Sequence, residues 1–151
     1  MALLEKHLEV KESTIPGAGK GLFTKIAIVK GTRIIEYRGK RTTWKGADHR
    51  NGSNAYLYCI DLKHTIDALT WPKSLARYIN DAKGLGKVKG ITNNCEFVDV
   101  GFRAFIDATK DIPAGAEILV GYGKEYWDVI RSNIKIDKAA KKEAARKKKG
   151  T

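Results

Sequence analysis

The segment Gly17-Ala-Gly-Lys-Gly-Leu-Phe23 interrupts a strand-like amino-terminal region of the chain. Before it, Leu8-Glu-Val-Lys11 alternates apolar and charged residues, which indicates a half-buried strand. Its glycines suggest a phosphate-binding loop, but the spacing matches neither G-x-G-x-x-G nor G-x-x-x-x-G-K-[ST], and a β-branched run follows instead of a helix. The glycines therefore form either a structural turn between strands or a loop whose backbone approaches a ligand closely.

Outward from this segment, short strand patterns dominate and helical spacing is rare. The predicted strands are Leu22–Lys30, Thr32–Tyr37, Tyr56–Leu62, His64–Leu69, Glu96–Val100, Phe102–Asp107 and Ala116–Val120. Ser74–Asp81 predicts one or two helical turns and Lys124–Ile134 a helix. The polar segment Arg38–Asn54 indicates a short helix or an irregular insertion, and the glycines and lysines of Lys83–Gly90 indicate a mobile loop. The sequence therefore predicts a mainly β fold.

Length and charge define the domain organisation. The chain has 151 residues, of which 42% are apolar, and a net charge of +12, so we expect one domain with a real core rather than a disordered chain. From Lys135 to Thr151, eight basic residues oppose two acidic ones, and no aromatic residue or apolar stripe is present. We therefore predict a folded domain over residues 3–134 and a flexible Lys-rich tail over residues 135–151.

Several classes of protein are disfavoured. No stretch approaches the ~18 apolar residues of a membrane span, and the charged amino terminus is unlike a secretory signal. We therefore expect an intracellular protein (cytoplasm, nucleoid or nucleus) that is not secreted. Cys59 and Cys95 lack zinc-site spacing and are expected to be buried small hydrophobes. The histidines, His7, His49 and His64, are expected on the surface, with no metal site. The aspartates near strand ends are expected in turns and hydrogen bonds; these are Asp61, Asp67, Asp107 and Asp111.

Seven motifs occur in an order that resembles the SET domain family of protein lysine methyltransferases. They are Gly17-x-Gly-x-Gly-Leu-Phe23, Lys30-Gly-Thr-x-Ile-x-Glu-Tyr-x-Gly39, Ile66-Asp-Ala68, Ala76-Arg-Tyr-Ile-Asn80, Asn93-Asn-Cys-Glu-Phe97, Lys110-Asp-Ile-Pro-Ala-Gly115 and Glu117-Ile-Leu-Val-Gly-Tyr-Gly-x-x-Tyr-Trp127. The resemblance implies the SET-domain β-clip fold, with several small sheets, short helices and a threaded carboxyl-terminal segment, followed here by a disordered basic tail.

The activity implied by this resemblance is methyl transfer from S-adenosyl-L-methionine to a lysine of a protein substrate. In-line displacement requires a neutral amine opposite the sulfonium, so positioning contributes more than acid/base chemistry. Burial in an aromatic channel lowers the lysine pKa from its usual ~10.4, because it disfavours the charged form. Histones or histone-like, DNA-associated basic proteins are the expected substrates.

The resemblance also assigns roles to individual residues. Tyr122 matches the family's catalytic tyrosine, and Tyr37 matches a second tyrosine of the channel that we also count as catalytic. The cofactor-binding residues would be Gly17, Ala18, Gly19, Lys20, Arg77, Asn80, Asp81, Tyr126 and Trp127. The substrate channel would be lined by Tyr37, Phe97, Phe105 and Tyr122. The alternative is that these aromatic residues have no functional role and are ordinary core residues of a strand-rich protein.

Departures from the family pattern keep a second hypothesis open. Asp81 stands where the family commonly has a histidine that contacts the cofactor, and a lysine-rich insertion, Gly84–Thr92, follows it. The family's zinc segments are absent, so the Lys124–Ile134 helix or the second subunit of a homodimer would have to wall the channel; a monomer and a homodimer both remain open. The alternative function is a catalytically degenerate SET-like module whose tail, residues 135–151, binds nucleic acid weakly and without sequence preference. The tail's lysines are also candidate methylation substrates.

Overall fold

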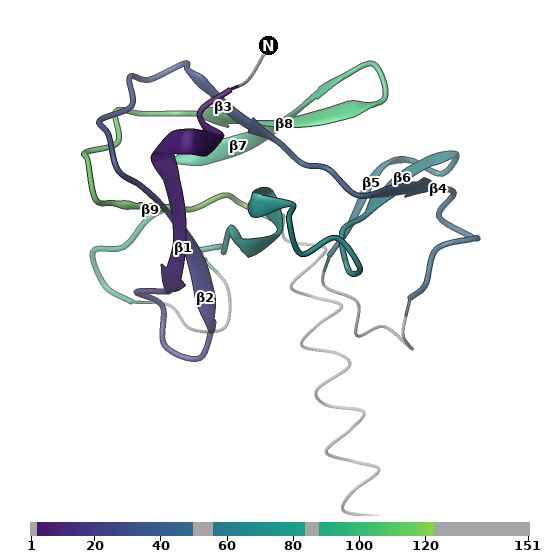
Figure 1. Cartoon of the computed structure of the whole chain (residues 1–151), viewed down its shortest axis with the longest axis horizontal. Helices are drawn as coiled ribbons and strands as arrows, with labels where there is room; N and C mark the ends of the chain where they lie inside the picture. The colour runs from purple at the N-terminus through teal and green to yellow at the C-terminus, as the bar shows by residue number, and fades with distance from the viewer. Residues whose placement is uncertain (1–2, 50–55, 84–87, 123–151) are drawn as a thin grey trace, which may run out of the picture. The chain divides into compact units, whose positions relative to one another are not determined.

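The computed structural model describes residues 3–49, 56–83 and 88–122. The chain divides into two units, residues 1–121 and 122–151, and the elements belong to the first (Figure 1). They are η1 (Glu5–His7), β1 (Leu8–Glu12), β2 (Lys20–Thr24), β3 (Arg33–Glu36), β4 (Lys40–Thr42), β5 (Leu57–Asp61), β6 (His64–Asp67), η3 (Leu75–Tyr78), β7 (Cys95–Val100), β8 (Arg103–Ala108) and β9 (Glu117–Ile118). None of the described helices is long and apolar enough to cross a bilayer.

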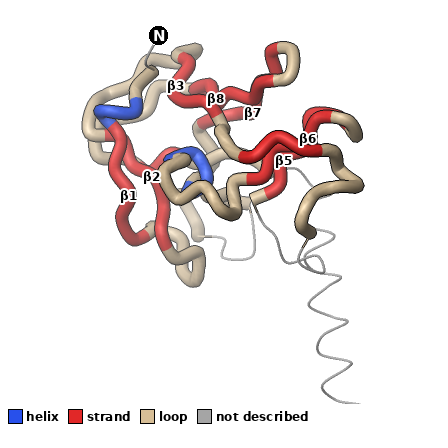
Figure 2. Tube along the Cα trace, turned by 45° about the vertical axis from the view of Figure 1, so that its right-hand side comes forward, coloured by secondary structure: helices blue, strands red, loops and turns tan. Residues whose placement is uncertain are grey.

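The strands form three small antiparallel sheets. Their orders are β1-β2-β9, β3-β8-β7 and β4-β6-β5. The 3₁₀ turn η3 lies between the β1-β2-β9 sheet and the β4-β6-β5 sheet in both views (Figures 1 and 2). Helical structure in the described ranges is limited to single 3₁₀ turns, so the predicted mainly β fold of several small sheets is confirmed.

Two predicted hairpins are confirmed because their turns and alternation agree. β7 and β8 join at Gly101, whose φ of 61° suits glycine, and Val100 pairs with Arg103. On β8, Ala104 and Ile106 are fully buried, as the period of two requires for one face of a strand. β5 and β6 join through residues 62 and 63 as predicted.

The structure corrects two element boundaries. The predicted strand Leu22–Lys30 ends at Thr24, because the buried Thr24 hydroxyl donates to the Ile26 carbonyl at 2.7 Å and turns the chain. Within Arg38–Asn54, Lys40–Thr42 forms β4 against β6, although its sequence has no strand pattern. Long-range pairing therefore makes a strand where local propensity does not.

The segment from β9 to Val120 is inserted between distant parts of the chain. β9 pairs antiparallel with β2, while Leu119 forms a parallel bridge with Asn80 and Val120 one with Cys95. Asn94 holds the same segment with its side-chain amide, which accepts from the Leu119 N–H and donates to the carbonyl of residue 117, both at 2.9 Å. This is the threading that the resemblance implies.

The prediction for the two cysteines is half right. Cys95 is buried, and burial raises the pKa of its thiol to about 12. Cys59 is exposed, so its predicted burial is wrong. It lies on the edge strand β5. Its neighbour Tyr58 faces Phe97, so the Cys59 side chain points to the opposite side of the strand.

The aspartates near strand ends accept hydrogen bonds as predicted. Asp61 accepts from Lys63, Asp67 from Leu69, Asp107 from Arg33 and Asp111 from Lys30.

Candidate active site

The glycine loop between β1 and β2 presents bare backbone to open space. Gly17 and Gly19 have φ values of 78° and 74°, which side-chain-bearing residues rarely adopt. The loop is closed by hydrogen bonds from the Ser13 N–H to the Gly19 carbonyl at 2.8 Å and from the Ala18 N–H to the Ile15 carbonyl at 3.2 Å. A Cβ added at Gly17 or Gly19 would meet no atom within 4 Å. The loop is thus a turn between strands that also leaves room for a ligand against its backbone.

A buried carboxylate on β9 fixes the start of this loop. Glu117 accepts from the Ser13 hydroxyl at 2.7 Å, the Thr14 hydroxyl at 2.6 Å and the Thr14 N–H at 2.9 Å. Only 6% of Glu117 is exposed. A side chain at position 21 would clash with this carboxylate, because a Cβ on Gly21 would lie 2.3 Å from a Glu117 carboxylate oxygen. β9, near the carboxyl end of the first unit, therefore sets the shape of the glycine loop near the amino end of that unit.

Asn80 joins the glycine loop to the threaded segment. Its side-chain N–H group donates to the Lys20 carbonyl at 2.9 Å, and its backbone carbonyl accepts from the Val120 N–H at 3.0 Å. Among the described residues, none donates to the Asn80 side-chain oxygen. Two predicted cofactor residues, Lys20 and Asn80, are therefore in contact, with one polar atom of Asn80 left to accept.

Asp81 organises the turn that follows Asn80. Its Oδ1 accepts from the Lys83 N–H at 2.8 Å and from the Asn93 side chain at 2.9 Å, while the Asn93 oxygen accepts from the Ala82 N–H at 2.8 Å. Asp81 is buried. The residue that departs from the family pattern thus acts as an internal hydrogen-bond acceptor. The next residue, Ala82, forms a buried cluster with Ile15 and Leu119, and Ala18 of the glycine loop packs against this cluster.

Three aromatic side chains from three strands or their ends gather in one cluster. The Tyr58 and Phe97 rings are stacked with centroids 4.4 Å apart, and Tyr37 lies 6.0 Å from each. The Tyr37 hydroxyl donates to the Tyr56 carbonyl and the Tyr58 hydroxyl to the exposed Asp99 carboxylate, both at 2.7 Å. Burial, together with that hydrogen bond, raises the pKa of Tyr58 far above its usual range, so the hydroxyl stays protonated at physiological pH.

Phe105 does not join this cluster. Phe97 pairs with Ile106 across β7 and β8, so Phe97 and Ile106 share one face of the sheet and Phe105 lies on the other. There its ring is covered by two guanidinium groups, with Arg33 4.5 Å and Arg103 5.0 Å from the centroid. The structure therefore brings together Tyr37 and Phe97 but places Phe105 among cations on the opposite face.

Arg77 has different partners from the predicted cofactor residues around the loop. Its guanidinium donates to the carbonyls of Ala68 and Leu69, both at 3.0 Å, and lies 4.2 Å from the Tyr56 ring centroid. These contacts tie η3 to the chain after β6. Arg77 thus supports the segment that carries Asn80 and, through Tyr56, the partner of the Tyr37 hydroxyl.

The Phe105 face carries a carboxylate whose titration can be tested. Hydrogen bonds from Arg103, at 2.7 and 3.1 Å, hold the pKa of Glu36 below its ordinary value of 4.5. The stabilisation is therefore present above about pH 4.5 and is lost as the pH falls through the lowered folded-state pKa. We expect Glu36→Gln to cost about 1 kcal/mol of unfolding free energy at pH 6 and less at pH 3, as measured by urea denaturation. A penalty that stays constant between the two pH values would contradict the ion pair.

With this geometry in place, comparison with known proteins identifies the family. The SET domain model matches residues 19–123. The chain belongs to the SET domain family. Two solved structures with similar folds are the methyltransferase domain of human PR domain-containing protein 2 (23% identity, 78% of this chain and 77% of that chain, TM-score 0.57) and a humanized mutant of the Chaetomium thermophilum Polycomb Repressive Complex 2 bound to the inhibitor GSK126 (24% identity, 86% of this chain and 16% of that chain, TM-score 0.65). No curated protein sequence matches the chain.

The carboxyl-terminal residues of the SET motifs are only partly described. Tyr122 follows Gly121 directly and is the first residue of the second unit. Tyr126, Trp127 and the predicted helix over Lys124–Ile134 lie outside the described residues, as does the predicted domain boundary after residue 134. The roles assigned to these residues stay predictions.

Two residues of this SET domain are not predicted by the sequence patterns. The strand pattern of Tyr58 indicates no role, and only its register against β6 and its stacking on Phe97 show that it joins the cluster. The motif that contains Glu117 indicates no function for its carboxylate. Its signal in the sequence is an acidic residue at the start of the apolar run Ile118–Val120, where a buried carboxylate requires hydrogen-bond donors.

Proposed function

We propose that this SET domain is an S-adenosyl-L-methionine-dependent protein lysine N-methyltransferase that acts on histone-like or other DNA-associated basic proteins. One observation carries the proposal. Leu119 pairs with Asn80, which holds the glycine loop, and the next residue, Val120, pairs with Cys95, two positions before Phe97. One short segment thus connects the candidate cofactor loop to the aromatic cluster, which is the arrangement needed to present a methyl donor to an amine.

The residues around the loop fit a methionine-type cofactor. The open backbone at Gly17 and Gly19 gives room for close approach. The side-chain oxygen of Asn80, which accepts no hydrogen bond from the described residues, is an acceptor suited to an ammonium group. When bound, S-adenosyl-L-methionine supplies an electrophilic methyl group on a sulfonium. The chain's own contribution is to hold the loop, through Glu117 and Asn80, in one shape that matches the donor.

The aromatic cluster fits the acceptor side. Tyr37, Tyr58 and Phe97 offer ring surfaces to the alkyl stem of a lysine, and both tyrosine hydroxyls already donate to carbonyl or carboxylate groups. Burial of the amine beyond this wall removes it from water, which disfavours the charged form and so favours the neutral nucleophile. The exposed Asp99 beside Tyr58 adds a negative charge that attracts a basic substrate.

The proposal is tested by methyl transfer with the purified full chain. Radiolabelled S-adenosyl-L-methionine should label lysines of a basic protein mixture, and mass spectrometry should place the added methyl groups on lysine side chains. Isothermal titration calorimetry should show cofactor binding without a protein substrate. Cofactor binding with no transfer to any basic mixture favours the degenerate module, and the absence of both would reject the proposal. Tail labelling without added substrate would identify residues 135–151 as a substrate.

Replacing Tyr122 by phenylalanine separates catalysis from binding. In the proposed role the Tyr122 hydroxyl orients the amine and the methyl group, so Tyr122→Phe should lower kcat at least tenfold and leave the cofactor Kd within about twofold. A matched control is Tyr78→Phe, because the one partner of the Tyr78 hydroxyl among the described residues is the Pro72 carbonyl, at a long 3.5 Å. Full turnover by Tyr122→Phe would show that the catalytic assignment is wrong.

A further inference from the structure

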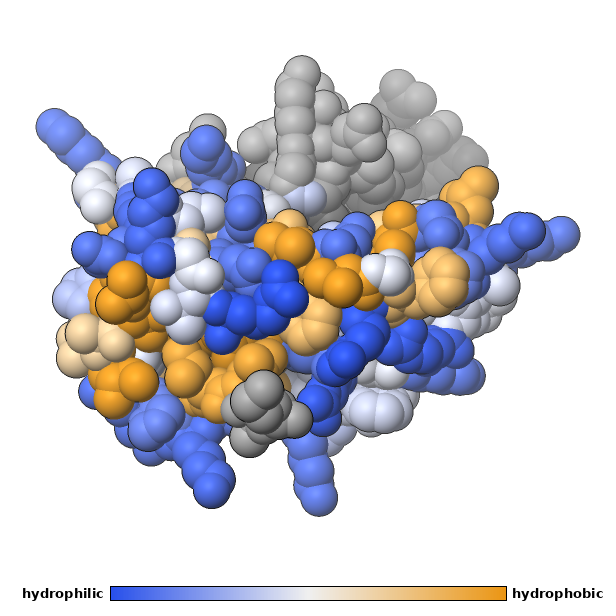
Figure 3. All heavy atoms as spheres, turned by 90° about the horizontal axis from the view of Figure 1, so that it is seen from above, coloured by the Kyte–Doolittle hydropathy of each residue, from blue (hydrophilic) through white to orange (hydrophobic). Residues whose placement is uncertain are grey.

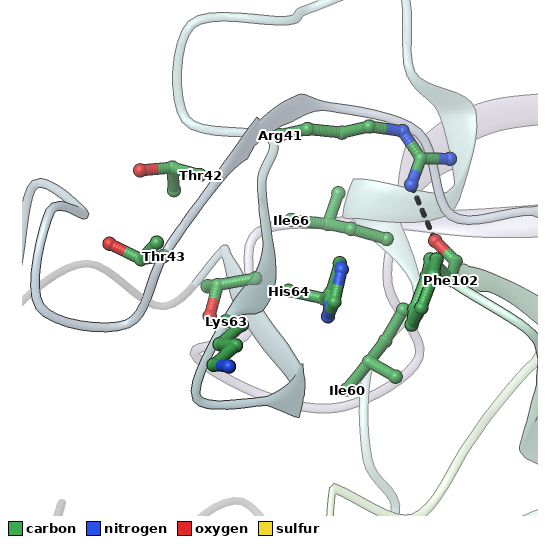
Figure 4. A pocket seen from close by; sticks show the side chains of 9 residues that line it. Arg41, Thr42, Thr43, Ile60, Lys63, His64, Ile66 and Phe102 are labelled. Atoms are coloured by element: carbon green, nitrogen blue, oxygen red, sulfur yellow. Dashed lines mark hydrogen bonds between the residues drawn. The ribbon is translucent and has the colours of Figure 1, made fainter.

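Two open hollows on the first unit share part of their lining. One, of about 390 Å³, is lined by β4, by the turn between β5 and β6 and by Phe102 in the turn between β7 and β8 (Figure 4). The other, of about 360 Å³, is lined by the chain from Glu36 to Gly39 and by Trp71 and Arg103. Arg41 and Ile66 line both. Together the two hollows form what we call the basic groove.

Positive charge is in excess along the basic groove. Its lining contains four cationic side chains and one carboxylate, which are Arg38, Arg41, Lys63, Arg103 and Glu36. Glu36 is buried and shared, since Arg103 bonds it at 2.7 Å and Arg38 lies 3.4 Å from it. The side chains of Arg38 and Arg103 remain 61% and 56% exposed. Their outward N–H groups are therefore available to an anion.

Arg41 and Lys63 add further positive charge, although the Asp61 carboxylate lies beside Lys63 and accepts a hydrogen bond from its backbone N–H. The Arg41 guanidinium donates to the backbone carbonyl of Phe102, a neutral group, as the dashed line in Figure 4 shows. Within residues 3–49, 56–83 and 88–122, neither Arg41 nor Lys63 forms an ion pair. A groove of this charge repels the basic proteins proposed as methyl acceptors and attracts polyanions.

Flat aromatic surfaces lie beside these cations. Phe102 is 53% exposed although one of its ring faces is stacked on His64, with centroids 3.6 Å apart and planes at 8°. Trp71, in the second hollow, is 45% exposed. Figure 3 shows hydrophobic and hydrophilic side chains interspersed on the face seen from above. Exposed rings next to arginines provide stacking platforms for bases and contacts for phosphates in one groove.

We propose that the basic groove binds single-stranded nucleic acid. Arg38, Arg41, Lys63 and Arg103 contact backbone phosphates, and bases stack on Phe102 and Trp71. The alternation of cations with exposed rings favours this occupant over an acidic peptide, which would use the charges but leave the rings uncovered. The groove is built from residues of the folded unit and acts independently of the tail. It would hold the enzyme on nucleic acid close to nucleic-acid-bound basic proteins.

The test uses the full chain and a fluorescent oligothymidylate of 20 nucleotides, with anisotropy measured over a series of salt concentrations. The variant Arg41→Gln/Lys63→Gln should weaken binding about tenfold and flatten the log K against log[salt] slope by about 1.4, since each single-strand phosphate contact contributes about 0.7. The variant Trp71→Ala/Phe102→Ala should also weaken binding about tenfold, with little change in the salt slope. The control Lys25→Gln/Lys30→Gln removes two exposed charges outside the groove and should stay within twofold of the parent.

Three outcomes would overturn the proposal. If the groove variants bind like the control variant, the tail accounts for the binding. If the aromatic variant binds oligothymidylate like the parent while polyglutamate competes at equal charge concentration, the groove is a site for acidic peptides. If the parent does not bind oligothymidylate at low salt, the groove takes no nucleic acid. Thermal unfolding of every variant confirms that it is folded, and methyl transfer to a free basic peptide tests the active site separately.

Discussion

Gly39→Ala is expected to lower the free energy of unfolding by about 3 kcal/mol, at the upper end of the cost of overpacking. A Cβ at Gly39 would lie 2.4 Å from the Asp67 carbonyl oxygen and 2.8 Å from the Ala68 nitrogen. Both are backbone atoms, so no side chain can rotate away. Asp67 cannot retreat either, because it pairs with Lys40 on one side and Leu57 on the other in the central strand β6.

Urea denaturation monitored by tryptophan fluorescence measures this effect. The matched control is Gly121→Ala, whose Cβ would meet, within the described part of the chain, the Asn93 amide nitrogen at 3.6 Å, an ordinary contact. It should change the unfolding free energy by less than about 1 kcal/mol. An unchanged urea midpoint for Gly39→Ala would mean that β4 and β6 are not in the close approach described, and that the glycine in the Glu-Tyr-x-Gly motif has another purpose.

Glu117→Ala is expected to cost about 3 kcal/mol of stability and to weaken cofactor binding at least tenfold. The substitution leaves the Thr14 N–H and the Ser13 and Thr14 hydroxyls without their carboxylate acceptor, and hydrogen bonds to a charged group contribute about 1.5–3 kcal/mol each. The hydroxyls can turn to water, so the contributions do not add in full. The glycine loop that starts at these residues then loses its fixed shape, which the ligand must restore on binding.

Two further variants locate the cause of this loss. Glu117→Gln keeps the shape and one acceptor oxygen, so its losses of stability and of cofactor affinity should be about half as large. Glu12→Ala removes an exposed carboxylate at the end of β1, close to the loop in sequence, and should leave both quantities unchanged. Calorimetric titration with S-adenosyl-L-methionine gives the affinity. Parent-like cofactor affinity in Glu117→Ala would show that the carboxylate supports the fold without shaping the binding site.

The sequence predicts those parts of the fold whose causes are local. Both predicted hairpins form between strands that are adjacent in the sequence, and the β7–β8 hairpin also carries the turn residue Gly101. β4 has neither signal, since it is a strand only because β6 lies beside it. The exposure of Cys59 also depends on tertiary structure. Cys59 is exposed because β5 is an edge strand and because its neighbour Tyr58 is the side chain that faces Phe97.

The motifs predict which residues belong to the site better than they predict how those residues contact one another. Ordered motifs bring Gly17, Asn80 and Phe97 to attention, but contacts across more than 100 residues, such as those of Glu117 with Ser13 and Thr14, have no local pattern. Phe105 shows the converse, since it is adjacent in sequence to Ile106 and therefore lies on the opposite face from Phe97. A strand's period assigns faces only when its register with the partner strand is known.

The insertion of the segment from β9 to Val120 also bears on the time course of folding. Its pairs with β2, Asn80 and Cys95 close loops of very different length, the longest of them spanning most of the first unit. Such closures are entropically costly and make a chain fold slowly. This same segment fixes the glycine loop, and its Val120 pairs with Cys95, two residues before Phe97 of the aromatic cluster. Affinity for the proposed methyl donor should therefore rise only with the last kinetic phase of refolding, and partly folded protein should not bind it.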